Sequence, residues 1–251
     1  MRKDGIARKL IGYALAIVFI LAGWQVTAML VDNAALPGPA EAFPMVVQYA
    51  GDLWPAFLVS LYRVVAAMLI GTVLAIPLGL ACGRSPRVDA VFAPVLYFLY
   101  PLPKVVLLPV LIVLMGLADA PKITLIAITI FFQVLVTVRD AAQSVPEQAV
   151  MSMRSLGAGR LDVYRHVIVP ATLPELFTAL RISSGTAVAI LFFAESLAGS
   201  TGLGYFIVDA WALLAYPKMF AGIIAMALLG VILYEFFDIA ERRLTKWRRV
   251  G

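Results

Sequence analysis

Long stretches without charge alternate with short charged segments along the chain. Residues 10–31 and 64–83 contain no Asp, Glu, Lys or Arg. A helix of about 20 apolar residues spans the ~30 Å hydrocarbon core of a membrane, so each stretch is long enough to cross it. The first stretch is longer than the apolar part of a signal peptide, and no small-residue cleavage site follows it. The pattern therefore predicts an integral membrane protein whose first span is 10–31.

The apolar pattern predicts six transmembrane helices in an all-α chain, with a single membrane domain over residues 1–251. The expected spans are about 10–31, 58–82, 90–116, 121–138, 176–197 and 219–238. We expect the third span to be kinked or broken, because it contains Pro94, Pro101, Pro103 and Pro109. The external stretch 199–218 is expected to include a short surface or re-entrant helix.

Composition and charge placement support this topology. Only 14% of the residues are charged, against about 25% in soluble domains, and the mean hydropathy is +0.96. The net charge is +5, and basic residues cluster in segments 2–9, 84–87, 139–165 and 242–249. By the positive-inside rule these segments and both termini are cytoplasmic, so the basic balance indicates topology and not nucleic-acid binding. The single Cys82 and the single His166 argue against an intrachain disulfide and a structural metal site.

The longest cytoplasmic segment, residues 139–175, contains signals for the start and the end of a helix. Ser144 and Glu147 match a capping box with a proline between them, which predicts a helix over about 145–156. Gly157 follows directly and is expected to end that helix, because glycine is the usual residue just beyond a helix C-terminus.

A second short helix is expected over about 160–169, because its apolar positions follow helical spacing and Pro170 stops it. The segment then has the form helix, glycine bend, helix. A basic amphipathic helix of this kind lies on anionic headgroups in some proteins and docks into a partner's groove in others. Gly157 and Gly159 favour docking, because they fix a bend and let backbones approach closely.

Four separated motifs resemble a known family. The sequence RSLGAGRLDVYRHVIVPATLP, at 154–174, resembles the cytoplasmic loop of ABC importer permeases. The sequences SLYRVVAAML (60–69), PLPKVVLLPVLIVLMG (101–116) and GLGYFIVDA (202–210) resemble the nitrate/sulfonate/taurine-type permeases of that group. The resemblance covers nearly the whole chain and implies a type I ABC importer permease fold. It also implies that the loop at 139–175 is a coupling helix that inserts into a separate nucleotide-binding subunit.

The resemblance assigns the contact with the ATPase to nine residues of this loop. They are Arg154, Leu156, Gly157, Ala158, Gly159, Arg160, Leu161, Tyr164 and Arg165. The family's Glu-Ala-Ala falls on Met151, Ser152 and Met153, so the acidic residue is absent there, and Glu147 lies one helical turn earlier. The chain has no G-x-x-x-x-G-K-[ST] loop, so ATP and Mg are expected in the partner subunit and no cofactor is expected in this chain.

The resemblance also implies partners and a location. Two ABC ATPase subunits, a second permease chain, a periplasmic substrate-binding protein and membrane lipid are expected, with the chain crossing the bacterial inner membrane several times. A homodimer is favoured, because helices that are apolar nearly all round leave little polar interior and a path then runs between two protomers. The family suggests a small solute such as a sulfonate, taurine, nitrate or a vitamin precursor.

Two other classes of function are alternatives to an importer permease. A secondary carrier or channel would also consist of apolar helices, but it has no need of a bent cytoplasmic docking loop and usually carries ionisable groups for ion coupling. A membrane enzyme is disfavoured, because the chain has neither H-E-x-x-H nor G-x-S-x-G and offers no catalytic set. The carrier or channel stays the alternative.

Four charged residues lie within or near the predicted spans: Arg63, Lys104, Arg181 and Glu195. Arg63 and Arg181 are close to span ends, where snorkelling to the headgroups satisfies them. Lys104 follows two helix-breaking prolines, and Glu195 follows an uncharged run, so both need a partner, water or a role. We expect both to face a protomer interface and to border the translocation path, either as an ion pair or as a separate gate and cation site. Purely structural pairing is the alternative.

Overall fold

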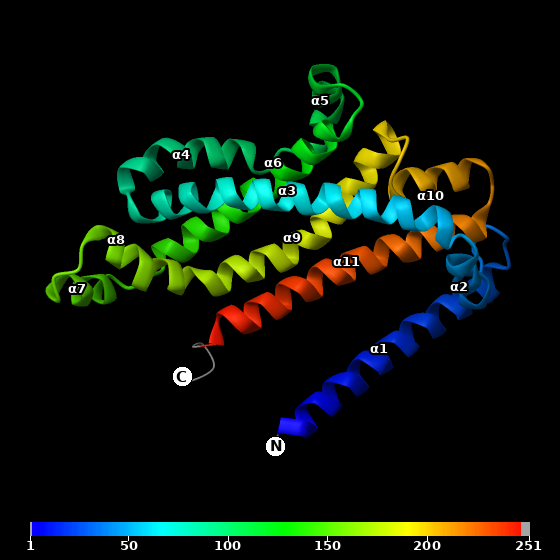
Figure 1. The fold of residues 1–251 in the computed structure, drawn as a ribbon, viewed down its shortest axis with the longest axis horizontal. Coiled ribbons are helices and arrows are strands. Elements are labelled where there is room, and N and C mark those ends of the chain that lie inside the picture. Colours follow the sequence, from blue (N-terminus) through cyan, green and yellow to red (C-terminus); the bar gives the residue numbers. More distant parts are fainter. Residues whose placement is uncertain (1, 247–251) are drawn as a thin grey trace.

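The computed structural model describes residues 2–246, and these residues form helices and connecting loops without strands (Figure 1). The elements in chain order are α1 (Arg2–Val31), α2 (Pro39–Gln48), α3 (Ala50–Arg84), α4 (Pro86–Leu99), η1 (Lys104–Leu107), α5 (Leu108–Met115), α6 (Asp119–Gln143), α7 (Glu147–Ser155), α8 (Arg160–Val163), η2 (Tyr164–Ile168), α9 (Val169–Ala198), α10 (Leu203–Ala212) and α11 (Tyr216–Leu244). The part of the expected basic tail from residue 247 onward lies outside the described residues.

Four helices in the described range are long and apolar enough to cross a membrane. They are α3, α6, α11 and a helix of 39 residues, Arg160–Ala198, that joins α8, η2 and α9. A fifth span is formed if α4 and η1–α5 are counted together, and α1 contributes a shorter apolar stretch, Leu15–Val31. The expected count of six spans is therefore not confirmed.

The expected break in the third span is present. α4 and the helix formed by η1 and α5 are bent by 85° at the turn that contains Pro101 and Pro103. Proline has no N–H to donate, and its ring clashes with the preceding turn of a helix, so two prolines in four residues end α4 here. Pro109 lies in the first turn of α5, where a missing N–H costs nothing.

The centre of the bundle is a close pair of helices, α3 and α6. A Cβ atom added to Gly71 would lie 2.7 Å from the Ala127 carbonyl oxygen, and one added to Gly83 would lie 2.6 Å from the Arg139 carbonyl oxygen. Small residues of this kind let the backbones of membrane helices approach each other. α9 packs against α6 and α11, and apolar side chains from all four helices form one buried core.

The short elements lie at opposite ends of the bundle (Figure 1). α7 and α8 are at one end, and α2 and α10 are at the other. α1 runs apart from the other helices and is fixed mainly near α2, where Trp24 stacks on Phe220 at 5.5 Å and donates a hydrogen bond to the Pro37 carbonyl at 3.0 Å. Much of the apolar surface of α1 is exposed, with Phe19 at 80% and Leu30 at 81%.

Candidate functional site

The bend in the loop at residues 139–175 is built by Gly157, as the sequence predicts. α7 ends at Ser155, and Gly157 has a φ of +83°, a conformation that favours glycine. Its N–H donates to the Arg154 carbonyl at 2.9 Å, and the Ala158 N–H donates to the Met153 carbonyl at 3.2 Å. These two bonds form a Schellman motif, which satisfies the last carbonyls of α7 and fixes the angle at which the chain leaves it.

The expected capping box at Ser144 is wrong. Ser144 is the C-terminal cap of α6, and its hydroxyl donates to the Ala141 carbonyl at 2.8 Å. The Glu147 carboxylate instead accepts a hydrogen bond from Arg84 at the end of α3, at 2.9 Å. The capping box does not form because α6 extends up to Ser144, and the Ser144 side chain bonds to the end of α6 instead of the start of α7.

The second helix of the loop does not end before Pro170, so this expectation is also wrong. The chain passes from α8 through the π-helical turn η2 directly into α9. The hydrogen-bond register changes in η2, immediately before Pro170, whose missing N–H cannot continue a regular pattern. The bend is therefore attached to a single helix that runs through the whole bundle.

The bend of this loop is open and exposes two leucines. The side chains of Leu156 and Leu161 are 84% and 80% exposed, whereas Val163 and Ile168 are buried and anchor the loop in the bundle core. Of the nine residues assigned to the coupling contact, seven are exposed and two are half-buried, Ala158 and Tyr164. An exposed apolar bend of this kind is typical of a protein–protein docking surface.

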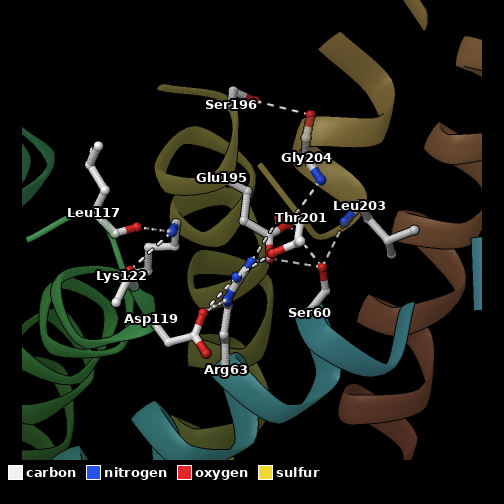
Figure 2. A network of polar contacts seen from close by, with 11 residues as sticks. Ser60, Arg63, Leu117, Asp119, Lys122, Glu195, Ser196, Thr201, Leu203 and Gly204 are labelled. Atoms are coloured by element: carbon white, nitrogen blue, oxygen red, sulfur yellow. Dashed lines mark hydrogen bonds and ion pairs between the residues drawn. The ribbon is translucent and has the colours of Figure 1, made fainter. Parts of the chain in front are cut away.

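At the opposite end of the bundle, four segments meet around the guanidinium of Arg63 (Figure 2). Arg63 lies on α3 and is 2% exposed, and Glu195 near the end of α9 is 0% exposed. Arg63 Nη1 lies 2.7 Å from Glu195 Oε1, and Arg63 Nη2 lies 2.6 Å from Oδ1 of Asp119, the first residue of α6. Nη1 and Nη2 also donate to the carbonyl and the hydroxyl of Thr201, at 2.9 and 2.8 Å. We name this set of Ser60, Arg63, Asp119, Glu195 and Thr201 the external cluster, because the sequence predicts that this end of the bundle is external.

The external cluster also holds the start of α10. Glu195 Oε2 accepts a hydrogen bond from the Gly204 N–H at 2.9 Å, and Ser60 Oγ accepts one from the Leu203 N–H at 2.8 Å. Ser60 donates in turn to the Glu195 carboxylate. The first N–H groups of a helix have no partner within it, and a negative charge near them is favourable. Gly202, with a φ of +101°, has no room for a side chain, because a Cβ would lie 2.3 Å from Glu195 Oε1.

The structure does not bring Lys104 and Glu195 together. Glu195 pairs with Arg63, so the expectation that Arg63 snorkels to the headgroups is wrong, and Glu195 is enclosed within one chain instead of facing another protomer. Lys104 lies at the break between α4 and α5, where its ammonium donates to the Tyr100 carbonyl. Arg181 pairs with Asp238 on α11 at 2.9 Å, which agrees with a structural role.

The Arg63–Glu195 pair was missed because the two residues are 132 positions apart. The hydropathy pattern places a residue within a span but does not say which spans are neighbours. One signal was present: Arg63 lies in the motif SLYRVVAAML (60–69), and Glu195 follows an uncharged run shortly before the motif GLGYFIVDA (202–210). Two such charges are expected to find each other, since a lone buried charge is costly.

Comparison with known proteins agrees with the fold and with the family resemblance. Residues 75–246 match the family model of the binding-protein-dependent transport system inner membrane component. The taurine transport system permease protein of Escherichia coli (strain K12) is 32% identical over 92% of this chain and 86% of its own length. A putative aliphatic sulfonates transport permease protein of Bacillus subtilis (strain 168) is also 32% identical, over 91% of this chain and 84% of its own length.

A solved structure extends the comparison to three dimensions. A chain from inward-facing conformations of the MetNI methionine ABC transporter matches with a TM-score of 0.63 and 19% identity, and the match covers 80% of this chain and 98% of that chain. This likeness supports the fold of an ABC importer permease, and the expectation from the sequence motifs is confirmed. The chain therefore belongs to the family of binding-protein-dependent transport system inner membrane components, and it is a multi-pass permease of the inner membrane and not an enzyme.

Proposed function

We propose that the chain is the membrane subunit of an ATP-driven importer that moves a small organic sulfonate into the cytoplasm. The observation that carries the proposal is the exposed apolar bend at Leu156–Leu161, which begins a helix of 39 residues that reaches the external cluster. A partner that moves the bend moves this helix, because the Schellman motif and the continuous backbone leave no flexible joint between them. The helix then transmits the movement to the other side of the membrane.

The partner of the bend is an ATPase subunit that binds ATP and Mg. Leu156 and Leu161 supply apolar contact, and Arg154, Arg160 and Arg165 surround them with positive charge on exposed positions. A cleft with an apolar floor and an acidic rim fits this surface. The assembly contains two such ATPase subunits and two copies of the permease, with both termini of the permease and the loop in the cytoplasm.

The relatives support a sulfonate as the substrate, and the family description supports delivery by a binding protein. The names of two relatives give taurine and aliphatic sulfonates, and both substrates carry a sulfonate group. An external binding protein delivers the substrate to the surface formed by residues 32–57 and 199–217, which includes α2 and α10. The path runs beside Lys104 at the break between α4 and α5. Glu195 acts on it from within the external cluster, by holding α10 in place.

The test is reconstitution of the permease with its ATPase and binding protein in lipid vesicles. Uptake of labelled taurine should require ATP and the binding protein. The double variant Leu156→Ser/Leu161→Ser should lose the ATPase subunits on size-exclusion chromatography, because the apolar contact is removed. The control is Leu244→Ser, an equally apolar exposed residue at the end of α11, which should leave the complex intact. A double variant that retains the ATPase and couples normally would contradict the proposal.

A further inference from the structure

Lys104 lies in an unusual place for a basic residue. It is the first residue of η1, at the 85° break between α4 and α5, within a pair of helices that together are apolar enough to form a span. An apolar cavity of about 350 Å³ lies beside it, lined by Leu99, Leu102, Val106, Leu107, Ile128 and Phe132. The side chain is partly exposed, so its ammonium can be reached.

The partners of the Lys104 ammonium are all neutral. It donates to the Tyr100 carbonyl and lies 5.4 Å from the centroid of the Tyr100 ring and 5.2 Å from that of Phe132. Among the side chains that the structure describes, those of residues 15–246, no carboxylate forms a salt bridge with it. An ammonium has three N–H donors, and the carbonyl uses one. Aromatic faces and one carbonyl stabilise the cation in part, but they leave its charge uncompensated.

The other deep basic residues of the described spans differ from Lys104. Arg63 is compensated by Glu195 and Asp119, Arg139 by Asp89, and Arg181 by Asp238. An anion that approached any of these would meet a carboxylate beside the cation.

Lys122 is also unlike Lys104. It is 2% exposed, and its ammonium donates to the carbonyls of Leu117 and Ala118 at 3.2 and 3.0 Å. A ligand cannot reach it without unfolding the start of α6. Lys218 also lies over two aromatic rings, those of Tyr49 and Phe206, but it is at the first turn of α11 and not at a break within a span. Lys104 therefore combines a free charge, access and a place within a span.

We propose that the Lys104 ammonium binds the anionic group of the transported solute as it passes the break between α4 and α5. This inference rests on the proposed function, and it names a sulfonate as the ligand. A sulfonate stays charged at physiological pH, and three oxygens accept hydrogen bonds from the two remaining N–H donors. The neutral partners of Lys104 suit a transient contact, because an arriving anion displaces a ring contact and not an ion pair. The solute also leaves again without separating a buried salt bridge.

The experiment uses the complete transporter, permease with ATPase and binding protein, in lipid vesicles, with labelled taurine as the probe. The variants are Lys104→Met, which keeps the length and apolar stem, and Lys104→Arg, which keeps the charge. The matched control is Arg87→Met, which removes the charge of an exposed basic residue in the first turn of α4, at the other end of the same broken span. Uptake is measured at saturating binding protein, together with ATP hydrolysis and assembly on size-exclusion chromatography.

Lys104→Met should lower taurine uptake about tenfold or more, which is the size expected for a lost charge-assisted hydrogen bond. Lys104→Arg should retain most uptake, Arg87→Met should match the wild type, and ATP hydrolysis by the complex should remain measurable in all of them. If Lys104→Met does not assemble, Lys104→Gln takes its place, since it keeps a polar side chain that can donate to the Tyr100 carbonyl.

Three results distinguish the proposed anion contact from the alternative explanations. Uptake within twofold of the wild type in both Lys104→Met and Lys104→Gln would overturn it. A defect that disappears in vesicles made without anionic lipid would assign Lys104 to a lipid headgroup and would also overturn it. Failure of the wild-type complex to move any sulfonate would instead refute the proposed function itself.

Discussion

At the scale of single residues, the hydroxyl of Ser60 joins three helices of the external cluster, because it both accepts and donates a hydrogen bond. It accepts a hydrogen bond from the Leu203 N–H and donates one to the Glu195 carboxylate, and the residue is fully buried. Ser60, Leu203 and Glu195 are each 0% exposed, so bulk solvent does not reach these groups. Removing one oxygen atom therefore leaves two polar groups short of a partner.

Ser60→Ala should reduce the free energy of unfolding by about 1–3 kcal/mol, the cost of a buried donor left without its acceptor. The measurement is thermal unfolding of the purified protein in detergent. The control is Ser184→Ala, which is 1% exposed but donates only to the Arg181 carbonyl of its own helix at 2.7 Å. That variant should cost about 0.5 kcal/mol or less, so equal shifts in the two variants would contradict the role of Ser60.

Arg63→Met should be among the most destabilising substitutions in the chain, at about 3–5 kcal/mol, because it leaves the buried Glu195 carboxylate without its cation. Arg84→Met is the comparison: Arg84 pairs with Glu147, whose side chain is 55% exposed, so its loss should cost about 1 kcal/mol or less. Both are measured by thermal unfolding of the purified protein. A cost for Arg63→Met no larger than for Arg84→Met would show that the external cluster does not hold the helices together.

At the scale of elements, the bend between α7 and α8 depends on backbone conformation and not on space. A Cβ atom at Gly157 would meet nothing within 4 Å, yet its φ of +83° strains any other residue. Gly159, two residues on, has a φ of −75°, which every residue adopts, and a Cβ there would meet only the Asp162 carboxylate at 3.4 Å. The two glycines thus provide a substitution and its control within one loop.

Gly157→Ala should weaken taurine-stimulated ATP hydrolysis in the reconstituted complex while lowering the unfolding free energy by only about 1–2 kcal/mol. Gly159→Ala should change neither quantity appreciably. The readouts are the ratio of stimulated to basal hydrolysis and the unfolding temperature. Normal stimulation in assembled Gly157→Ala would mean that the angle of the bend does not matter for coupling.

The elements that the sequence predicts well are those set by neighbouring residues. The stop at Gly157 and the break around Pro101 and Pro103 depend on local backbone chemistry, and both are present. The expected stop at Pro170 failed because a π-helical turn, which no short pattern announces, carries the helix through the proline. The partner of Glu195 could not be predicted either, since it depends on which helices pack side by side.

At the scale of the whole molecule, the bundle leaves much apolar surface uncovered. Phe98 and Val113 are 83% and 84% exposed on the broken span, and α1 runs apart from the other helices (Figure 1). Lipid covers part of such a surface, and a second permease chain covers the rest in the proposed assembly. Native mass spectrometry of the detergent-solubilised complex should therefore give two permease chains and two ATPase subunits. A functional complex with one permease chain would refute this arrangement.

The helix Arg160–Ala198 has a mechanical consequence. At about 1.5 Å per residue, its 39 residues make a rod of about 58 Å. A tilt of about 5° around its middle displaces each end by about 2.5 Å, close to the length of a hydrogen bond. Glu195 lies near one end and the glycine bend near the other, so a small displacement of the bend moves Glu195 relative to Arg63 on α3 by a distance close to the 2.7 Å between them. In the proposed assembly, a small motion at the ATPase is therefore enough to loosen α9 and α10 from α3 at the other end of the bundle.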